Sequence, residues 1–340
     1  MPRNLFEYNS VTGYRFISAI RARVRHEGGG YFVHCNELGF RCDHEVTKAK
    51  PRGTFRILLF GDSYTAGEGV SNRFRFGDLV ERKVPGVQVL NFGLPGSGTD
   101  QQYLTFQQFA QDLEYDLLLL CPLVENIQRN MNTHRLTQSA FDGTLVLRPK
   151  PYFRLNDGEL VLHHCPVPKV PLSPSGPDDT NRQQDAASGS LRRGLRKLTG
   201  QVDQVVPGFR RLTQRLRRIS LPKEYNDAGH PAWLLMGAIL TQWVRESSAP
   251  VLICPLPTFG HIDGGILPHA YRDRFAELGR KLKVQVVDVL ARFLMETRDV
   301  RLRCRFQNDE HPTPLGHAMI AEALLPHVRK HVDAARLDGE

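Results

Sequence analysis

The stretch "RILLFGDSYTAGEGV", Arg56 to Val70, decides how the rest of the chain is interpreted. It begins with a continuous apolar run, Phe55 to Phe60, of the kind that predicts a strand buried on both faces of a parallel sheet. The run leads directly into Gly61-Asp62-Ser63, where a helix is expected to begin. Ser63 is therefore either a helix cap or a nucleophile held at the end of a strand.

Four more apolar runs have the same character, and helical periodicity separates them. They begin at Val87, Tyr115, Pro250 and Val284, and the helical stretches are 74–83, 99–112, 271–283 and 316–331. Strand followed by helix, repeated, predicts a doubly wound α/β sheet with right-handed crossovers. Ligands in such a sheet bind beyond the carboxyl ends of the strands.

The chain divides into a core with a lead-in and one insertion. Residues 1–52 predict a strand-and-turn lead-in that packs on the core, and 53–131 form the first part of the core. The α/β rhythm then breaks over 132–245, where short strands around Asn156-Asp157-Gly158 precede a Pro- and Ser-rich linker and two basic amphipathic helices. We interpret 132–245 as an insertion or lid, and 246–340 as the second part of the core.

The residues just beyond the predicted strands carry the chemistry. Ser63 follows the first strand, a glycine-rich loop containing Gly96 follows the second, Asn126 follows the third, and Asp309 and His311 stand near the end of the chain. A serine hydroxyl becomes a nucleophile when an imidazole takes its proton, and an acid orients that imidazole. Glycine N–H groups and an asparagine amide suit a developing oxyanion. This inventory predicts acyl transfer.

These residues resemble the four blocks of the SGNH, or GDSL, hydrolases: "FGDSYTAGEGV", "NFGLPGSGTDQQ", "VENIQRN" and "NDEHPTPLGHAMIAEAL". The resemblance covers about 56–130 and 284–325. It implies a three-layer α/β/α sandwich of flavodoxin-like type, with a parallel five-stranded sheet and a helical insertion. It also implies that Ser63 is the nucleophile and His311 the base, with Asp309 as its acid, and that Ser63, Gly96 and Asn126 form the oxyanion hole.

Two assignments keep alternatives. The third block lacks the family's usual Gly and Asp beside the asparagine, so Glu125 or Asn130 could align in place of Asn126. The fourth block usually has its acid three residues before the histidine, where this chain has Asn308; we choose Asp309 because an amide cannot compensate an imidazolium charge.

Several other classes of function lose support. The chain has no Walker motif and no G-x-S-x-G elbow, and the G-x-x-G-x-G spacing of Gly93, Gly96 and Gly98 is not that of a dinucleotide loop. His163, His164 and Cys165 lack a second pair at ligand spacing, so we expect no metal and no cofactor. The arginines are not interleaved with aromatic residues, so nucleic acid is not an expected partner.

The net charge of +9 comes from one segment. Residues 190–223 hold ten Lys or Arg and one acid, a pattern that is typical of a solvated face and also suits an acidic carrier, an anionic substrate or an anionic surface. The six scattered cysteines, the charge-broken first residues and the lack of a long apolar run predict a cytoplasmic protein without a transmembrane segment.

The sequence leads to three hypotheses about function. The first is a serine esterase acting on O-acetyl or other short acyl esters, including those of saccharides. The second is an O-acyltransferase with the same triad. The third is a binding protein that keeps the fold without the chemistry, suggested by the altered third block.

Overall fold

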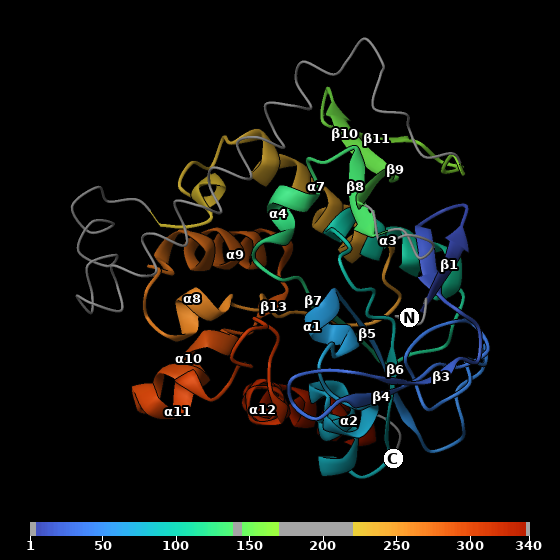
Figure 1. Cartoon of the computed structure of the whole chain (residues 1–340), viewed down its shortest axis with the longest axis vertical. Coiled ribbons are helices and arrows are strands. Elements are labelled where there is room, and N and C mark those ends of the chain that lie inside the picture. The colour runs from blue at the N-terminus through green and yellow to red at the C-terminus, as the bar shows by residue number, and fades with distance from the viewer. Residues whose placement is uncertain (1–4, 139–144, 170–219, 338–340) are drawn as a thin grey trace.

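The computed structural model describes residues 5–138, 145–169 and 220–337 and has a parallel sheet at its centre (Figure 1). The sheet strands are β5 (Phe55–Gly61), β6 (Val87–Asn91), β7 (Leu117–Cys121), β12 (Val251–Ile253) and β13 (Gln285–Val286). Their order is β13-β12-β7-β5-β6, and every neighbouring pair is parallel. This is the flavodoxin-like order, so the predicted sheet is confirmed.

Helices cover both faces of the sheet, which gives three layers (Figure 1). One layer consists of α2 (Phe76–Lys83), α10 (Val289–Leu294) and α12 (Pro314–Leu337). The other consists of α3 (Thr99–Phe109), α7 (Pro231–Glu246) and α9 (His269–Leu282). The four predicted helical stretches all contain a helix, with ends that move by a few residues. The predicted α/β/α sandwich is therefore confirmed.

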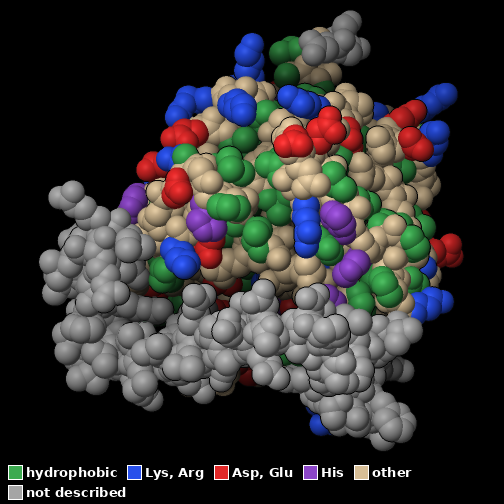
Figure 2. Space-filling model, turned by 90° about the horizontal axis from the view of Figure 1, so that it is seen from above, with side chains coloured by type: hydrophobic (Ala, Val, Ile, Leu, Met, Phe, Trp, Pro, Cys, Tyr) green, Lys and Arg blue, Asp and Glu red, His purple; other side chains and the backbone are tan. Residues whose placement is uncertain are grey.

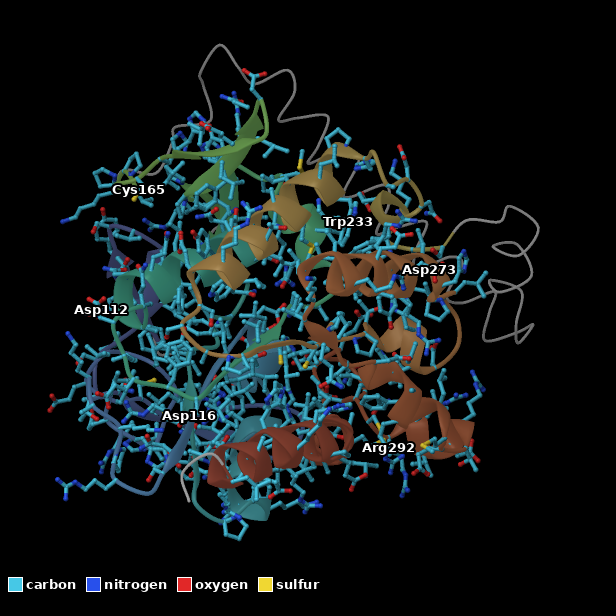
Figure 3. The ribbon with its side chains drawn as sticks, turned by 180° about the vertical axis from the view of Figure 1, so that it is seen from behind. Asp112, Asp116, Cys165, Trp233, Asp273 and Arg292 are labelled. Carbon is cyan, nitrogen blue, oxygen red and sulfur yellow. The ribbon has the colours of Figure 1, made fainter. Side chains whose placement is uncertain are left out.

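Helix α7 belongs to the core, whereas the sequence boundary at residue 245 counted it with the insertion. Its apolar side chains join the main hydrophobic cluster, and Trp243 is 1% exposed. Near its start Trp233 packs on Phe275 of α9, with ring centroids 5.5 Å apart (Figure 3). The helix leads into β12, so the core resumes at Pro231, before the expected boundary.

Among the described residues, four antiparallel strand pairs lie outside the sheet. In the lead-in, β1 (Phe6–Asn9) pairs with β2 (Gly13–Phe16) and β3 (Arg21–Val24) with β4 (Tyr31–His34). In the insertion, β8 (His134–Gln138) pairs with β9 (Leu145–Pro149) and β10 (Tyr152–Asn156) with β11 (Glu159–His163). The predicted Asn-Asp-Gly turn joins β10 to β11, with Asp157 and Gly158 at positive φ.

Six short helices complete the described structure. They are α1 (Ser63–Ala66), η1 (Asn72–Phe74), α4 (Asn126–Arg129), η2 (Lys223–Tyr225), α8 (Phe259–Ile262) and α11 (Arg298–Leu302). Among the described helices, none is long and apolar enough to cross a membrane. The two predicted basic helices fall on 170–219, outside the described residues. On the described part of the face in Figure 2, basic and acidic side chains are intermixed.

The core depends on the central strands. Every residue of β5 and β7 is buried. Leu118 of β7 is 0% exposed and lies between β5 and β12, opposite Leu58 and Val251. At the amino-terminal edge, Asp116 accepts a hydrogen bond from the Arg56 backbone N–H at 2.7 Å (Figure 3). The carboxyl ends of the strands meet at the opposite edge.

We expect Leu118→Ala to lower the free energy of unfolding by about 2–5 kcal/mol, because it leaves a cavity in the tightly packed sheet. Urea denaturation followed by circular dichroism measures this change. Leu294→Ala is the matched control, since Leu294 is 41% exposed and its loss is expected to cost less than about 0.5 kcal/mol. Equal stabilities for the two variants would contradict the assignment of the core.

Candidate active site

Helix α1 presents Ser63 at the carboxyl end of β5. The helix cap is Asp62, whose Oδ1 accepts a hydrogen bond from the Tyr64 backbone N–H at 3.1 Å. Ser63 is the first helical residue, and the hydroxyl is not needed as a cap. Among the described residues, Ser63 Oγ has no hydrogen-bond partner, and the residue is 4% exposed.

The loop after β6 lies directly against α1. A Cβ at Gly93 would lie 2.4 Å from the Ala66 backbone nitrogen, so only glycine allows this approach. The Leu94 N–H donates to the Gly61 carbonyl at 3.0 Å, which ties the loop to the end of β5. Gly96 follows with a φ of +74°, a left-handed conformation that favours glycine. The first two predicted blocks therefore meet at this edge.

The lead-in and the insertion hold the Gly96 loop from outside. Tyr14 of β2 donates its hydroxyl to the Pro95 carbonyl at 2.6 Å. The Arg135 guanidinium of β8 stacks over the Tyr14 ring, with its carbon 3.7 Å from the centroid. The same guanidinium lies 3.2 Å from where a Gly96 Cβ would be. The sequence analysis identified Gly96, but it did not identify Tyr14 or Arg135 as residues that hold the loop.

A buried polar cluster joins the first three blocks; we call Asp62, Ser97, Asn126 and Arg129 the Asp62 cluster. Asn126 Nδ2 donates to Asp62 Oδ2 at 3.2 Å and to the Ser97 carbonyl at 3.4 Å. Arg129 Nη1 donates to the same two oxygens, at 2.7 and 3.2 Å. The Asp62 side chain is 0% exposed. Arg129, which the sequence analysis missed, thus neutralises the buried Asp62 beside Ser63.

Of the three candidates for the third block, Asn126 is the residue in the Asp62 cluster. Asn130 instead accepts a hydrogen bond from the Asp100 backbone N–H at 3.3 Å, at the start of α3. Asp100 in turn forms a buried ion pair with Lys150, whose ammonium also donates to the Arg129 carbonyl at 3.2 Å. Asn130 therefore belongs to the packing of α3 on α4.

We expect Arg129→Met to lower the free energy of unfolding by about 3 kcal/mol, because it leaves the Asp62 carboxylate buried without a cation. This is the low end of the range for a buried pair, since the Arg129 side chain is 29% exposed. The measurement is again urea denaturation. Arg272→Met is the control, because its partner Asp288 is 37% exposed and surface pairs contribute about 1 kcal/mol or less. A smaller loss for Arg129→Met than for Arg272→Met would contradict this account.

Asp309 and His311 lie in the loop between α11 and α12. His311 Nδ1 donates to Asp309 Oδ1 at 2.5 Å, and the His311 backbone N–H donates to the same oxygen at 3.0 Å. Asn308, the alternative acid position, points elsewhere: its Nδ2 donates to Glu27 at 3.0 Å. Of the two candidates, Asp309 is therefore the one that contacts the imidazole.

The lead-in positions the loop that carries this pair. His26 Nε2 donates to the other Asp309 oxygen, Oδ2, at 3.0 Å. The Glu27 carboxylate accepts the backbone N–H groups of Asn308 and Asp309, each at 2.9 Å. Both residues lie between β3 and β4, so a segment some 280 positions away in sequence orients Asp309. These two contacts were not predicted.

His311 lies beside α1 but forms no hydrogen bond with the Ser63 hydroxyl. Its ring lies 5.6 Å from the Tyr64 ring, centroid to centroid, and the Tyr64 hydroxyl donates to the Glu310 carbonyl at 2.7 Å. His311 Nε2, the atom expected to face Ser63, instead lies 3.0 Å from Glu68 Oε2. The predicted residues are brought to one edge of the sheet, with Glu68 at the position expected for the serine.

The two carboxylates keep the imidazole charged. Burial lowers the pKa of His311, but the hydrogen bonds with Asp309 and Glu68 outweigh it and raise the pKa to about 10. The hydrogen bond with His311 holds the pKa of Asp309 well below its usual range, against burial and with help from His26. His317 differs: it is buried in α12, and burial followed by the charges of Arg75 and Arg41 lowers its pKa to about 3. His317 is 0% exposed and is therefore a packed residue.

The other reactive side chains lie away from this edge or are buried. His163 stacks on Tyr152 with centroids 5.0 Å apart, beside His164 and the exposed Cys165. Within 5–138, 145–169 and 220–337, no group of three or more His, Cys, Asp or Glu side chains is arranged to hold a metal ion. All six cysteines lie within these ranges and are free thiols.

No protein-family model matches the chain, and no curated protein matches it. Several solved structures are similar to the chain. A member of the lipolytic G-D-S-L family from Veillonella parvula is 11% identical and covers 80% of this chain and 97% of its own, with a TM-score of 0.43. An acetyl xylan esterase is 12% identical and covers 81% and 100%, with a TM-score of 0.44. An acetylxylan esterase from Geobacillus stearothermophilus is 12% identical and covers 81% and 94%, with a TM-score of 0.40.

Proposed function

We propose that the chain is a serine esterase of the SGNH, or GDSL, type, with Ser63 as nucleophile, His311 as base and Asp309 as its orienting acid. The observation that carries the proposal is the Asp309–His311 hydrogen bond of 2.5 Å beside the helix that begins with Ser63. The four sequence blocks support it independently, because each lies at the carboxyl edge of the sheet. The residues named need no cofactor for this chemistry.

In the proposed reaction, Ser63 Oγ attacks the ester carbonyl carbon while its proton passes to His311 Nε2. The carbonyl π electrons move onto the oxygen, and the backbone N–H groups of Ser63 and Gly96 together with the Asn126 amide stabilise this oxyanion. When the oxyanion collapses, the alkoxide leaves and takes the proton from Nε2. Water then repeats the sequence on the acyl-enzyme and releases the acid.

The substrate class proposed is an O-acetyl or other short acyl ester, with esters on a saccharide as the leading case. This rests on the sequence resemblance, as does the alternative of an O-acyltransferase, in which a sugar hydroxyl replaces water in the second half of the reaction. Residues 190–223, with ten basic side chains and one acid, are our candidate contact for an anionic substrate or an acidic carrier.

One observation favours a second candidate, a binding protein without catalysis. His311 Nε2 is engaged by Glu68, and the Asn126 amide donates within the protein to Asp62 and Ser97. A site whose base and oxyanion donor both have internal partners could bind an ester without cleaving it.

The experiment that separates these candidates is labelling with a fluorophosphonate, followed by peptide mass spectrometry. Covalent modification of Ser63 is the expected result, since the probe reacts with activated serines and leaves other hydroxyls unmodified. An unlabelled Ser63 in folded protein would favour the binding protein. Product analysis with an acetylated sugar, with and without a second sugar as acceptor, then separates hydrolysis from transfer.

A further inference from the structure

Glu68 is attached to the same helix as the proposed nucleophile. Its backbone N–H donates to the Ser63 carbonyl at 3.0 Å, in the turn that ends α1. Gly67 and Gly69 flank it with φ values of +80° and +87°. Glycine at both positions lets the chain turn sharply, and the Glu68 side chain thereby reaches the imidazole that Ser63 is expected to use.

The contact engages the atom on which the proposed reaction depends. His311 Nδ1 is held by Asp309, so only Nε2 can accept the Ser63 proton, and Nε2 lies 3.0 Å from Glu68 Oε2. The contact is an ion pair, so Nε2 carries a proton while the Glu68 carboxylate is in place. A protonated Nε2 cannot accept the Ser63 proton, so the ion pair with Glu68 and the hydrogen bond from Ser63 exclude each other.

We propose that Glu68 is a positioning residue that competes with Ser63 for His311 Nε2 and holds the site in a resting state until its carboxylate turns away. The proposal rests on the proposed function, since it assigns Glu68 a role in that same site. Activation requires two movements. The Glu68 carboxylate, 37% exposed, rotates into water, and the Nε2 proton passes to solvent, which leaves a neutral imidazole that accepts the Ser63 hydrogen bond.

The surroundings of His311 allow the effect of Glu68 to be isolated. Groups that face the imidazole or its two carboxylates come from its own loop, from α1 and its turn, from the β3–β4 hairpin and from α12. They are Asp309, Glu310, Tyr64, Glu68, His26, Tyr31 and His317. Among these described groups, Asp309 and Glu68 are the carboxylates that contact the ring. Glu310 uses only its backbone carbonyl, toward Tyr64.

The test compares Glu68→Gln with the matched control Glu310→Gln, which removes a carboxylate from the neighbouring position without touching Nε2. The first readout is the titration of His311 by NMR of histidine-labelled protein, with His311→Asn identifying the resonance. An opposite charge this close shifts a histidine pKa by ~1–3 units. We expect the lower end of this range, because the Glu68 carboxylate is partly exposed to water and its charge is screened. We expect the titration midpoint to fall by about one pH unit in Glu68→Gln and to stay in place in Glu310→Gln.

The second readout is the rate of fluorophosphonate labelling across pH. A fall of about one unit in the titration midpoint of His311 raises its neutral fraction about tenfold at pH 7. Ser63 in Glu68→Gln should therefore be labelled about tenfold faster at that pH. Glu68→Ala, which removes the carboxylate without adding an amide, should behave in the same way, and circular dichroism checks that both variants fold. An unchanged midpoint, or a lowered midpoint with no gain in labelling, would overturn the competition between Glu68 and Ser63.

These outcomes are separable from failure of the proposed function. The NMR titration detects the contact between Glu68 and His311 whether or not the protein cleaves an ester. If wild type and both Glu68 variants leave Ser63 unlabelled, the esterase and the competition both fail. If Ser63 is labelled in wild type and the Glu68 variants match it in midpoint and rate, only the role of Glu68 fails.

Discussion

Ser63→Ala is expected to lower the rate of aryl acetate hydrolysis by about 10⁴-fold or more, because the variant lacks the hydroxyl that attacks the ester and gives its proton to His311 Nε2. The measurement is kcat/KM with a chromogenic acetate, corrected for the uncatalysed reaction. Stability should be unchanged, since the Ser63 hydroxyl has no hydrogen-bond partner among the described residues and Asp62 caps α1.

Ser248→Ala is the matched control. Ser248 is exposed and precedes β12, so it lies at the opposite edge of the sheet from Ser63. We expect wild-type activity from this variant. A Ser63→Ala protein that hydrolyses the ester at the wild-type rate would contradict the assignment of the nucleophile.

Asp309→Asn is expected to reduce kcat by about 10⁴-fold. The amide can turn its N–H₂ toward Nδ1, which favours the imidazole tautomer with its proton on Nε2, where the base must be free. It also removes the charge that stabilises the imidazolium formed during attack. Because the Asp309 hydrogen bond helps to raise the pKa of His311 to about 10, the remaining activity should reach its plateau at a lower pH than in wild type.

The pH dependence of kcat tests both parts of this prediction. Asp299→Asn is the control, because Asp299 is an exposed carboxylate on α11, in the segment that leads into the same loop. It should retain the wild-type rate and pH profile. Equal rates for Asp309→Asn and wild type would show that the imidazole is oriented by another group.

The fold could be predicted because its determinants are local. Each buried strand is a run of apolar residues, and β5 and β7 are buried at every position, as the runs indicated. Helix α7 was missed as part of the core because it follows a long irregular insertion. Pro231 at its first turn, followed by thirteen residues without another proline or a charge before Arg245, could have identified it.

The candidate site was predicted only in part, because its order depends on contacts between distant segments. Ser63, Asn126, Asp309 and His311 follow strands or stand in a turn, and sequence alone could select them. Arg129, Glu68 and His26 carry no local pattern that distinguishes them from other surface charges. The partners of these three residues depend on how the loops fold back on the sheet. The spacing and periodicity of residues in the sequence do not predict those contacts.

The contact of His26 and Glu27 with Asn308 and Asp309 has a consequence for biosynthesis. The hairpin that bears His26 and Glu27 is translated before the loop that it contacts, which follows 281 or more positions later. A nascent chain with a finished β5 and α1 still lacks an oriented imidazole. The proposed reactivity of Ser63 would consequently arise only after the loop with His311 has been translated, and shorter nascent chains would not react.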